Sequence, residues 1–118
     1  MPTPTEIRVR QATRVLALSF DDGYQCELDF EYLRVNSPSA EVKGHGPGQE
    51  TLVVGKESVQ IAGCEPVGNY AVKILFDDGH DSGLYTWDYL YSLGQDYTAN
   101  WADYLQRLAD AGHTRSVS

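Results

Sequence analysis

Apolar and polar residues alternate along five short segments of this chain, which is the pattern of half-buried β-strands. Three of the segments come early and two come later: Glu6–Gln11, Arg14–Phe20, Tyr24–Phe30, Ser58–Ile61 and Tyr70–Phe76. Turn-forming residues separate neighbours, so that consecutive strands run antiparallel. The pattern therefore predicts a fold rich in antiparallel β-sheet.

The spacing of apolar residues becomes helical in the last third of the chain. Thr86 can cap a helix that begins at Trp87 and stops near Gly94. A second helix is predicted over residues 96–112, where an apolar stripe recurs at i, i+3, i+4, i+7 and i+8: Trp101, Tyr104, Leu105, Leu108 and Ala109. Gly112 is placed to end it, and residues 113–118 are expected to form a frayed tail. The predicted fold class is thus α+β with a C-terminal helix.

One sequence unit occurs twice. Phe20–Gly23 (FDDG) returns unchanged as Phe76–Gly79, and Phe30–Leu33 (FEYL) returns as Trp87–Leu90 (WDYL). Asp-Gly between two strands is a strong hairpin signal, because Gly accepts the positive φ of a tight turn. The repeat therefore predicts two hairpins, each leading into a helix.

Length and charge narrow the classes of function. The chain has 118 residues, which suits one domain spanning residues 1–118. Nine basic against seventeen acidic residues give a net charge of −8, which disfavours nucleic acid and anionic membrane surfaces as partners. Since no apolar run approaches the roughly 20 residues of a membrane span, we expect a cytoplasmic protein.

Two histidines are candidates for chemistry, each with a second interpretation. His80 follows the second Asp-Gly turn among three aspartates, which indicates either a metal or acid–base cluster or a solvated turn. His45 lies between two glycines in a long predicted loop, Asn36–Gln49, where the backbone could approach a ligand or the histidine could simply be exposed. Cys26 and Cys64 lack metal-site spacing and are expected to be core residues.

Aromatic residues crowd the C-terminal third, and they too have two interpretations. They could form a core whose tyrosine hydroxyl groups reach the solvent, or an exposed patch that anchors a partner or a second copy of the chain. The candidates for such contacts are Tyr85, Trp87, Tyr97 and Trp101, together with His45.

Three segments carry a resemblance to a known family. Residues 32–39 (YLRVNSPS), 65–72 (EPVGNYAV) and 76–87 (FDDGHDSGLYTW) resemble the gamma-butyrobetaine hydroxylase N-terminal-like domain family, also called DUF971. The resemblance covers about residues 10–95 and is to the free-standing bacterial type. It implies an accessory module, because the oxygenase chemistry of the hydroxylases belongs to a separate, larger domain.

The resemblance also implies a metal site that this chain has altered. Hydroxylases of the family hold zinc with three cysteines and a histidine, and those positions fall here on Ser37, Ser39, Val42 and His80. Serine is a poor zinc ligand at neutral pH and valine is none, so no structural zinc and no other cofactor is expected.

Our leading hypothesis is a non-enzymatic binding or assembly module that contacts a protein partner or a second copy of itself. The alternative is a metal-binding accessory protein of iron or iron-sulfur metabolism, in which His45 and His80 approach each other and share zinc or iron. The third hypothesis is an enzyme with an unrecognised pocket. It ranks last because no catalytic signature is present in the sequence.

Overall fold

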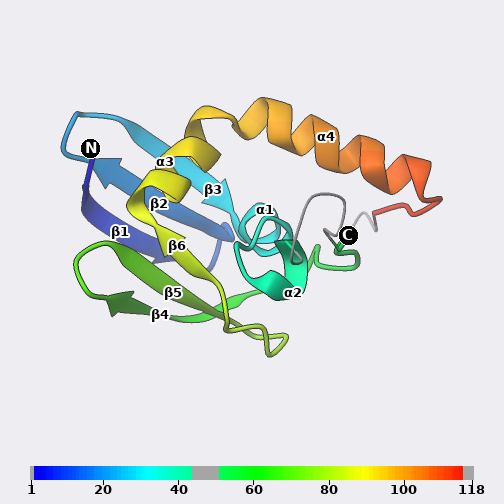
Figure 1. Ribbon diagram of the computed structural model, residues 1–118, viewed down its shortest axis with the longest axis horizontal. Coiled ribbons are helices and arrows are strands. Elements are labelled where there is room, and N and C mark those ends of the chain that lie inside the picture. The colour runs from blue at the N-terminus through cyan, green and yellow to red at the C-terminus, as the bar shows by residue number, and fades with distance from the viewer. Residues whose placement is uncertain (1, 44–50, 116–118) are drawn as a thin grey trace.

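A computed structural model describes residues 2–43 and 51–115 of the chain. Within these residues the chain forms two three-stranded antiparallel sheets and four helices, in the order βββααβββαα (Figure 1). The first sheet and its helices are β1 (Pro4–Arg10), β2 (Val15–Phe20), β3 (Gln25–Asp29), α1 (Phe30–Val35) and α2 (Ala40–Lys43). The second half comprises β4 (Ile61–Val67), β5 (Ala71–Phe76), β6 (Leu84–Thr86), α3 (Trp87–Gln95) and α4 (Tyr97–Asp110). The predicted α+β class is confirmed.

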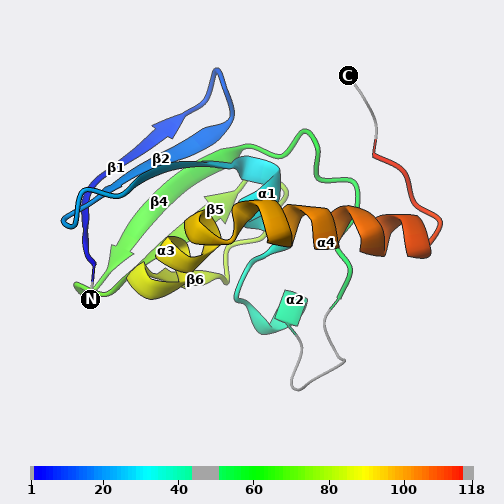
Figure 2. The same ribbon diagram turned by 90° about the horizontal axis from the view of Figure 1, so that it is seen from above.

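The middle strand of each sheet supplies the core. Alternate residues of β2 are buried, and β5 buries four of its six residues. Both strands contribute to one continuous apolar cluster, which includes Leu16, Leu18, Phe20, Val72, Ile74 and Phe76. The two sheets therefore share a core; α3 lies over it, and α4 continues from α3 past α1 and beyond the sheets (Figures 1 and 2).

The two Asp-Gly turns have the same geometry. Gly23 and Gly79 both have φ +90°, and each donates its backbone N–H to the phenylalanine three residues earlier, Phe20 and Phe76. In each copy a short strand follows the turn and leads directly into a helix, β3 into α1 and β6 into α3. The predicted pair of hairpin-to-helix units is confirmed.

Contacts between the two copies are reciprocal. The Tyr32 hydroxyl of α1 donates to the Leu93 carbonyl at 2.7 Å, and the Tyr89 hydroxyl of α3 donates to the Asn36 carbonyl at 2.5 Å. Donor and acceptor are displaced by the same 57 residues, 89 against 32 and 93 against 36. Because the same contact is made in both directions, the two copies are related by an approximate two-fold axis.

Two predicted boundaries were wrong. The strand predicted at Ser58–Ile61 begins only at its last residue and continues to Val67, through Gly63 and Pro66, which break the alternation. Proline is tolerated there because β4 lies at the edge of its sheet. The predicted loop Asn36–Gln49 contains the short helix α2, and its residues 44–49 lie outside the described part of the chain.

Gly94 does not end α3, which continues to Gln95. It is instead a point of close packing: a Cβ at this position would lie 2.8 Å from both Cys26 Sγ and Tyr24 Oη.

The predicted C-terminal helix is observed as α4, with Gly112 beyond its end at φ +77°. Gly112 donates to the Ala109 carbonyl and His113 to the Leu108 carbonyl, which is the Schellman arrangement. The expectation of a frayed tail was wrong for Arg115, whose guanidinium pairs with Glu31 of α1, a side chain with 8% of its surface exposed.

Candidate functional site

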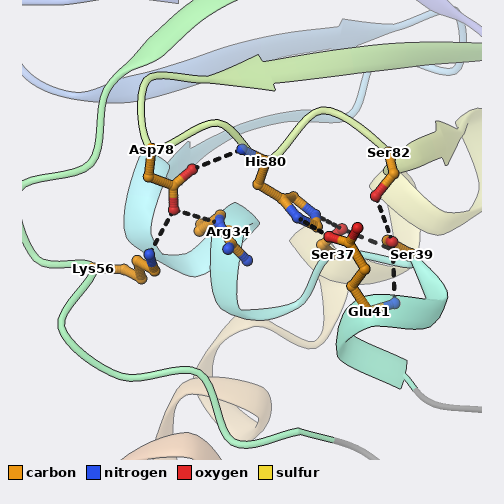
Figure 3. Close-up of polar contacts among 8 residues, drawn as sticks. All are labelled: Arg34, Ser37, Ser39, Glu41, Lys56, Asp78, His80 and Ser82. Atoms are coloured by element: carbon orange, nitrogen blue, oxygen red, sulfur yellow. Dashed lines mark hydrogen bonds and ion pairs between the residues drawn. The ribbon is translucent and has the colours of Figure 1, made fainter.

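Three of the four positions that the family resemblance indicated lie together, where the segment between α1 and α2 meets the segment between β5 and β6 (Figure 3). Ser37 Oγ lies 2.8 Å from His80 Nε2, although the two residues are 43 positions apart. Ser37, Ser39 and His80 are 0%, 7% and 5% exposed. The turn that carries His80 therefore closes over the two serines.

His80 uses both ring nitrogens. Its Nδ1 lies 3.0 Å from Glu41 Oε2, and Glu41 is the acidic residue in the first turn of α2. Ser37, His80 and Glu41 thus form a serine–histidine–carboxylate chain of the kind that activates a hydroxyl nucleophile in hydrolases. Glu41 was missed in the sequence because it lay in a predicted loop, with no spacing that links it to His80.

The buried environment of Ser37 gives a substrate no room to reach the hydroxyl. Ser37 has no exposed surface, and Gly83 lies so near that a Cβ there would be 2.5 Å from Ser37 Oγ. The same oxygen accepts the Ser39 backbone N–H at 3.3 Å. A nucleophile needs a site nearby for the reacting atom. The triad geometry therefore acts here as an internal hydrogen-bond network.

Ser39 extends this network and begins α2. Its hydroxyl lies 2.6 Å from Ser82 Oγ and accepts the backbone N–H of Glu41 at 3.2 Å. Serine is a preferred residue at this capping position because it satisfies an N–H that the helix leaves unpaired. The hydroxyl thus joins the start of α2 to the segment that follows β5.

The donor set does not fit the zinc ion that the resemblance implies. Val42, at the position of the third cysteine, is 4% exposed and offers no donor atom. Ser37 and Ser39 offer neutral hydroxyls, and both nitrogens of His80 already have hydrogen-bond partners. Among residues 2–43 and 51–115, no three His, Cys, Asp or Glu side chains gather in a way that could hold a metal ion. His45 lies outside this part of the chain.

A cluster of ions lies beside the network on the same turn. Asp78 accepts from Arg34 Nε of α1 at 2.9 Å and from Lys56 Nζ at 2.6 Å, and its other oxygen accepts the His80 backbone N–H (Figure 3). Burial raises the pKa of Asp78, but these donors outweigh that effect and hold the pKa at about 2. Asp78 therefore stays ionised and fixes the turn against α1.

The two cysteines have the environment of core residues. Burial raises the pKa of both the Cys26 and the Cys64 thiol, so neither is an activated thiolate at neutral pH. Both thiols are free and pack against the shared core.

All four predicted aromatic contact residues are at least partly buried. Tyr85 is fully buried and donates to the Leu33 carbonyl at 2.6 Å, so its placement on an exposed patch was wrong. Tyr97 is partly buried and stacks on Tyr32 with ring centroids 4.6 Å apart. Trp101 is also partly buried, beneath the Arg115 guanidinium at 5.2 Å.

Trp87 is partly buried and packs against the core, and it also lines a pocket together with Tyr70, which the sequence did not single out. Tyr70, Thr86, Trp87 and Asp88 line a pocket of about 320 Å³ where β6 enters α3. Tyr70 is 53% exposed, and Leu84, on the same face of β6 as Thr86, is 41% exposed. Tyr70 is the first residue of the predicted strand Tyr70–Phe76, and the alternation of apolar residues in that strand did not predict that its side chain is exposed.

No helix in the described part of the chain is long and apolar enough to cross a membrane.

Comparisons with known proteins agree with the fold. A family model described as gamma-butyrobetaine hydroxylase-like, N-terminal, matches residues 7–91. Two solution NMR structures are similar, both at TM-score 0.84: one is 49% identical over 98% of this chain and 86% of its own, and the other is 48% identical over 100% and 94%. No curated protein matches.

A third solved relative carries a family name. It is a crystal structure of a protein of unknown function of the DUF971 family from Acidithiobacillus ferrooxidans, 40% identical over 78% of this chain and 92% of its own, with TM-score 0.66. The matched family model spans most of the chain, including both hairpins and the Ser37–His80 network. On these grounds the chain belongs to the gamma-butyrobetaine hydroxylase-like, N-terminal family, DUF971.

Proposed function

We propose that this protein is a non-catalytic interaction module, which contacts a protein partner through the surface formed by Tyr70, Leu84 and Trp87. The observation that carries the proposal is the exposure of Tyr70 and Leu84, at 53% and 41%, beside a pocket lined by Trp87. Aromatic residues held at a surface are the usual anchors of protein interfaces. We name these three residues the aromatic surface.

Hydrogen bonds hold the aromatic surface rigidly, which favours binding. The Trp87 indole N–H donates to the Asn69 carbonyl at 2.7 Å, and the Trp87 backbone N–H donates to the Tyr70 carbonyl at 3.1 Å. Groups that are fixed before binding lose less entropy when a partner docks. The β4–β5 turn and the start of α3 thus present one preformed surface.

The environment of the reactive side chains supports a non-catalytic role. His80 is buried, and its two ring nitrogens already contact Ser37 and the exposed carboxylate of Glu41. A catalytic base needs access to a substrate proton. The network that holds it stabilises the fold on which the aromatic surface is built.

Site-specific photo-crosslinking in the source cells tests the proposal. A benzophenone amino acid is placed at Leu84 or, as a matched control, at Leu105 of α4, which has nearly the same exposure of 40%. We expect a discrete heterologous adduct from position 84 and none from position 105. The identified partner, purified, should then bind the unmodified protein and lose affinity for the Tyr70→Ala variant.

Other crosslinking outcomes overturn the proposal. Equal adducts from both positions, or none from position 84, contradict an interface at the aromatic surface. An adduct of twice the monomer mass means that the surface binds a second copy of this chain instead of a heterologous partner.

We also infer that the protein carries no stoichiometric zinc or iron, since Ser37, Ser39 and Val42 replace the three cysteine ligands. Elemental analysis of protein purified without chelator or affinity tag checks this. One metal ion per chain would contradict it and favour the metal-binding accessory function.

A further inference from the structure

We propose that the pocket between Tyr70 and Trp87 takes a cationic side chain, lysine or arginine, that the protein partner presents. This inference rests on the proposed function and names the chemistry of the group that docks. The pocket has an aromatic ring from the β4–β5 turn, a second from the start of α3, and one carboxylate, Asp88, among its four lining residues.

The charges around the pocket favour a cation. The Asp88 side chain is exposed and forms no hydrogen bond or ion pair with another described residue, so its charge is available to a ligand. The faces of tyrosine and tryptophan rings carry partial negative charge and attract lysine and arginine. The whole chain adds a net charge of −8, which attracts a basic partner over a longer range.

The indole N–H of Trp87 and the hydroxyl of Thr86 already have partners within the fold. The Trp87 indole N–H is already bonded to the Asn69 carbonyl, so a ligand need not supply an acceptor for it. The Thr86 hydroxyl accepts the Tyr89 backbone N–H and caps α3. The Tyr70 ring lies against Gly68, where a Cβ would come within 2.9 Å of its Cε1. Two positioned rings and one free carboxylate remain for a ligand.

The open form of the site favours a side chain over a free small molecule. Pockets for small ligands usually enclose 70–90% of the ligand surface. Only four residues line this pocket, from the β4–β5 turn, the end of β6 and the start of α3, and Tyr70 remains half exposed. Such a site covers the end of a side chain, while the rest of the contact is made by the exposed surface around it, including Leu84.

The proposal is tested by NMR titration of the ¹⁵N-labelled protein. The probe is the blocked tripeptide acetyl-Gly-Arg-Gly-amide, and its neutral analogue contains citrulline in place of arginine. We expect saturable shifts of the Trp87 indole N–H and of the amides of Tyr70 and Asp88 with the arginine peptide. The Trp101 indole N–H, on α4, is the internal reference and should not shift.

Two variants of equal charge locate the binding. Asp88→Asn should weaken binding of the arginine peptide about three- to fivefold, as expected for the loss of one exposed charge pair. Asp103→Asn removes another exposed carboxylate, on α4, and should leave the affinity unchanged. Equal binding of the citrulline peptide, or equal loss in both variants, overturns the proposal.

A third probe distinguishes a free cation from a side chain. If tetramethylammonium binds more tightly than the arginine peptide, the pocket is a small-molecule site and the proposal is wrong. The titration tests whether the pocket binds a cation, and the crosslinking tests whether the surface binds a partner, so one result can be negative without the other. A partner adduct at position 84 without arginine binding leaves the interaction function standing and removes the cation, whereas arginine binding without an adduct removes the function.

Discussion

Ser37 and His80 are joined by a buried hydrogen bond between two segments that are distant in sequence. At this position a hydroxyl satisfies one ring nitrogen of His80. Ser37→Ala removes the partner of His80 Nε2 and of the Ser39 backbone N–H. We expect a loss of about 1–3 kcal/mol in the free energy of unfolding, measured in urea, because a buried polar group is left unsatisfied.

Ser82 provides the control for this variant. Its hydroxyl bonds Ser39 from the same network, but Ser82 is exposed, so that water can replace the lost partner in Ser82→Ala. The expected loss is therefore smaller. Equal losses in the two variants would contradict the importance of the buried Ser37–His80 bond.

Asp78 gives the fold a distinct response to acid. Its pKa of about 2 lies below its ordinary value near 3.8, because Lys56, Arg34 and the His80 N–H outweigh the effect of burial. A lowered pKa means that the ionised side chain stabilises the fold above pH 4, and that this contribution is lost as the pH falls toward 2. Asp78→Asn should be destabilised at neutral pH.

The pH dependence of the difference is the test. The free energies of unfolding of Asp78→Asn and the unmodified protein should converge between about pH 4 and pH 2, measured in urea at each pH. Asp103→Asn, on an exposed face of α4, is the control and should differ little from the unmodified protein throughout. A difference that stays constant below pH 4 would show that ionisation of Asp78 contributes nothing.

At the level of elements, Gly94 of α3 is an exception to the rule that alanine stabilises a helix more than glycine does. A glycine inside a helix is ordinarily about 1 kcal/mol less favourable than alanine. Gly94 lies inside α3, but a Cβ there would lie 2.8 Å from Cys26 Sγ and Tyr24 Oη of the first hairpin. We therefore expect Gly94→Ala to lower the midpoint of urea unfolding, because α3 must move away from the hairpin.

A second substitution shows whether this contact is the cause. Cys26→Ala removes one of the two close atoms, so in that background Gly94→Ala should be less damaging than it is alone. If the two substitutions are simply additive, the close approach of Sγ does not explain the effect of the alanine.

Elements with local signals were predictable from the sequence, and those that depend on distant partners were not. The Asp-Gly turns, the alternating strands β2 and β5 and the Gly112 cap carry their signal within a few residues. The position of strand β4 was predicted wrongly because Gly63 and Pro66 interrupt the alternation of its apolar residues. The strand forms there because it pairs with β5.

The candidate site was predictable only in part for the same reason. Ser37 and Ser39 were singled out only through the family resemblance, and His80 also through its place after the second Asp-Gly turn; no spacing in the chain connects the three. Glu41 and Tyr70 were missed because their roles come from tertiary contacts: one with His80 across the fold, the other with the start of α3. Tyr85 was misplaced because aromatic content alone does not distinguish a core from a surface.

On the scale of the whole molecule, the approximate two-fold relation between the copies can be tested by energetics. Each copy donates one tyrosine hydroxyl to a carbonyl of the other copy, Tyr32 to Leu93 and Tyr89 to Asn36. The surroundings of the two hydroxyls differ, because the Tyr32 hydroxyl also accepts from Asn100 Nδ2 of α4 at 3.0 Å. Helix α4 thus adds a hydrogen bond to the Tyr32 hydroxyl that the Tyr89 hydroxyl does not have.

Removing each hydroxyl in turn separates the tyrosine-to-carbonyl hydrogen bond, which both copies make, from the hydrogen bond that Asn100 donates to Tyr32 alone. Tyr89→Phe should cost about 0.5–1.5 kcal/mol in the free energy of unfolding, the usual value of one hydrogen bond. Tyr32→Phe should cost more, because Asn100 also loses its acceptor. In an Asn100→Ala background, in which that acceptor is no longer needed, the two tyrosine variants should approach the same cost. If Tyr32→Phe remains the more damaging there, the two contacts are not energetically equivalent and the symmetry is one of geometry alone.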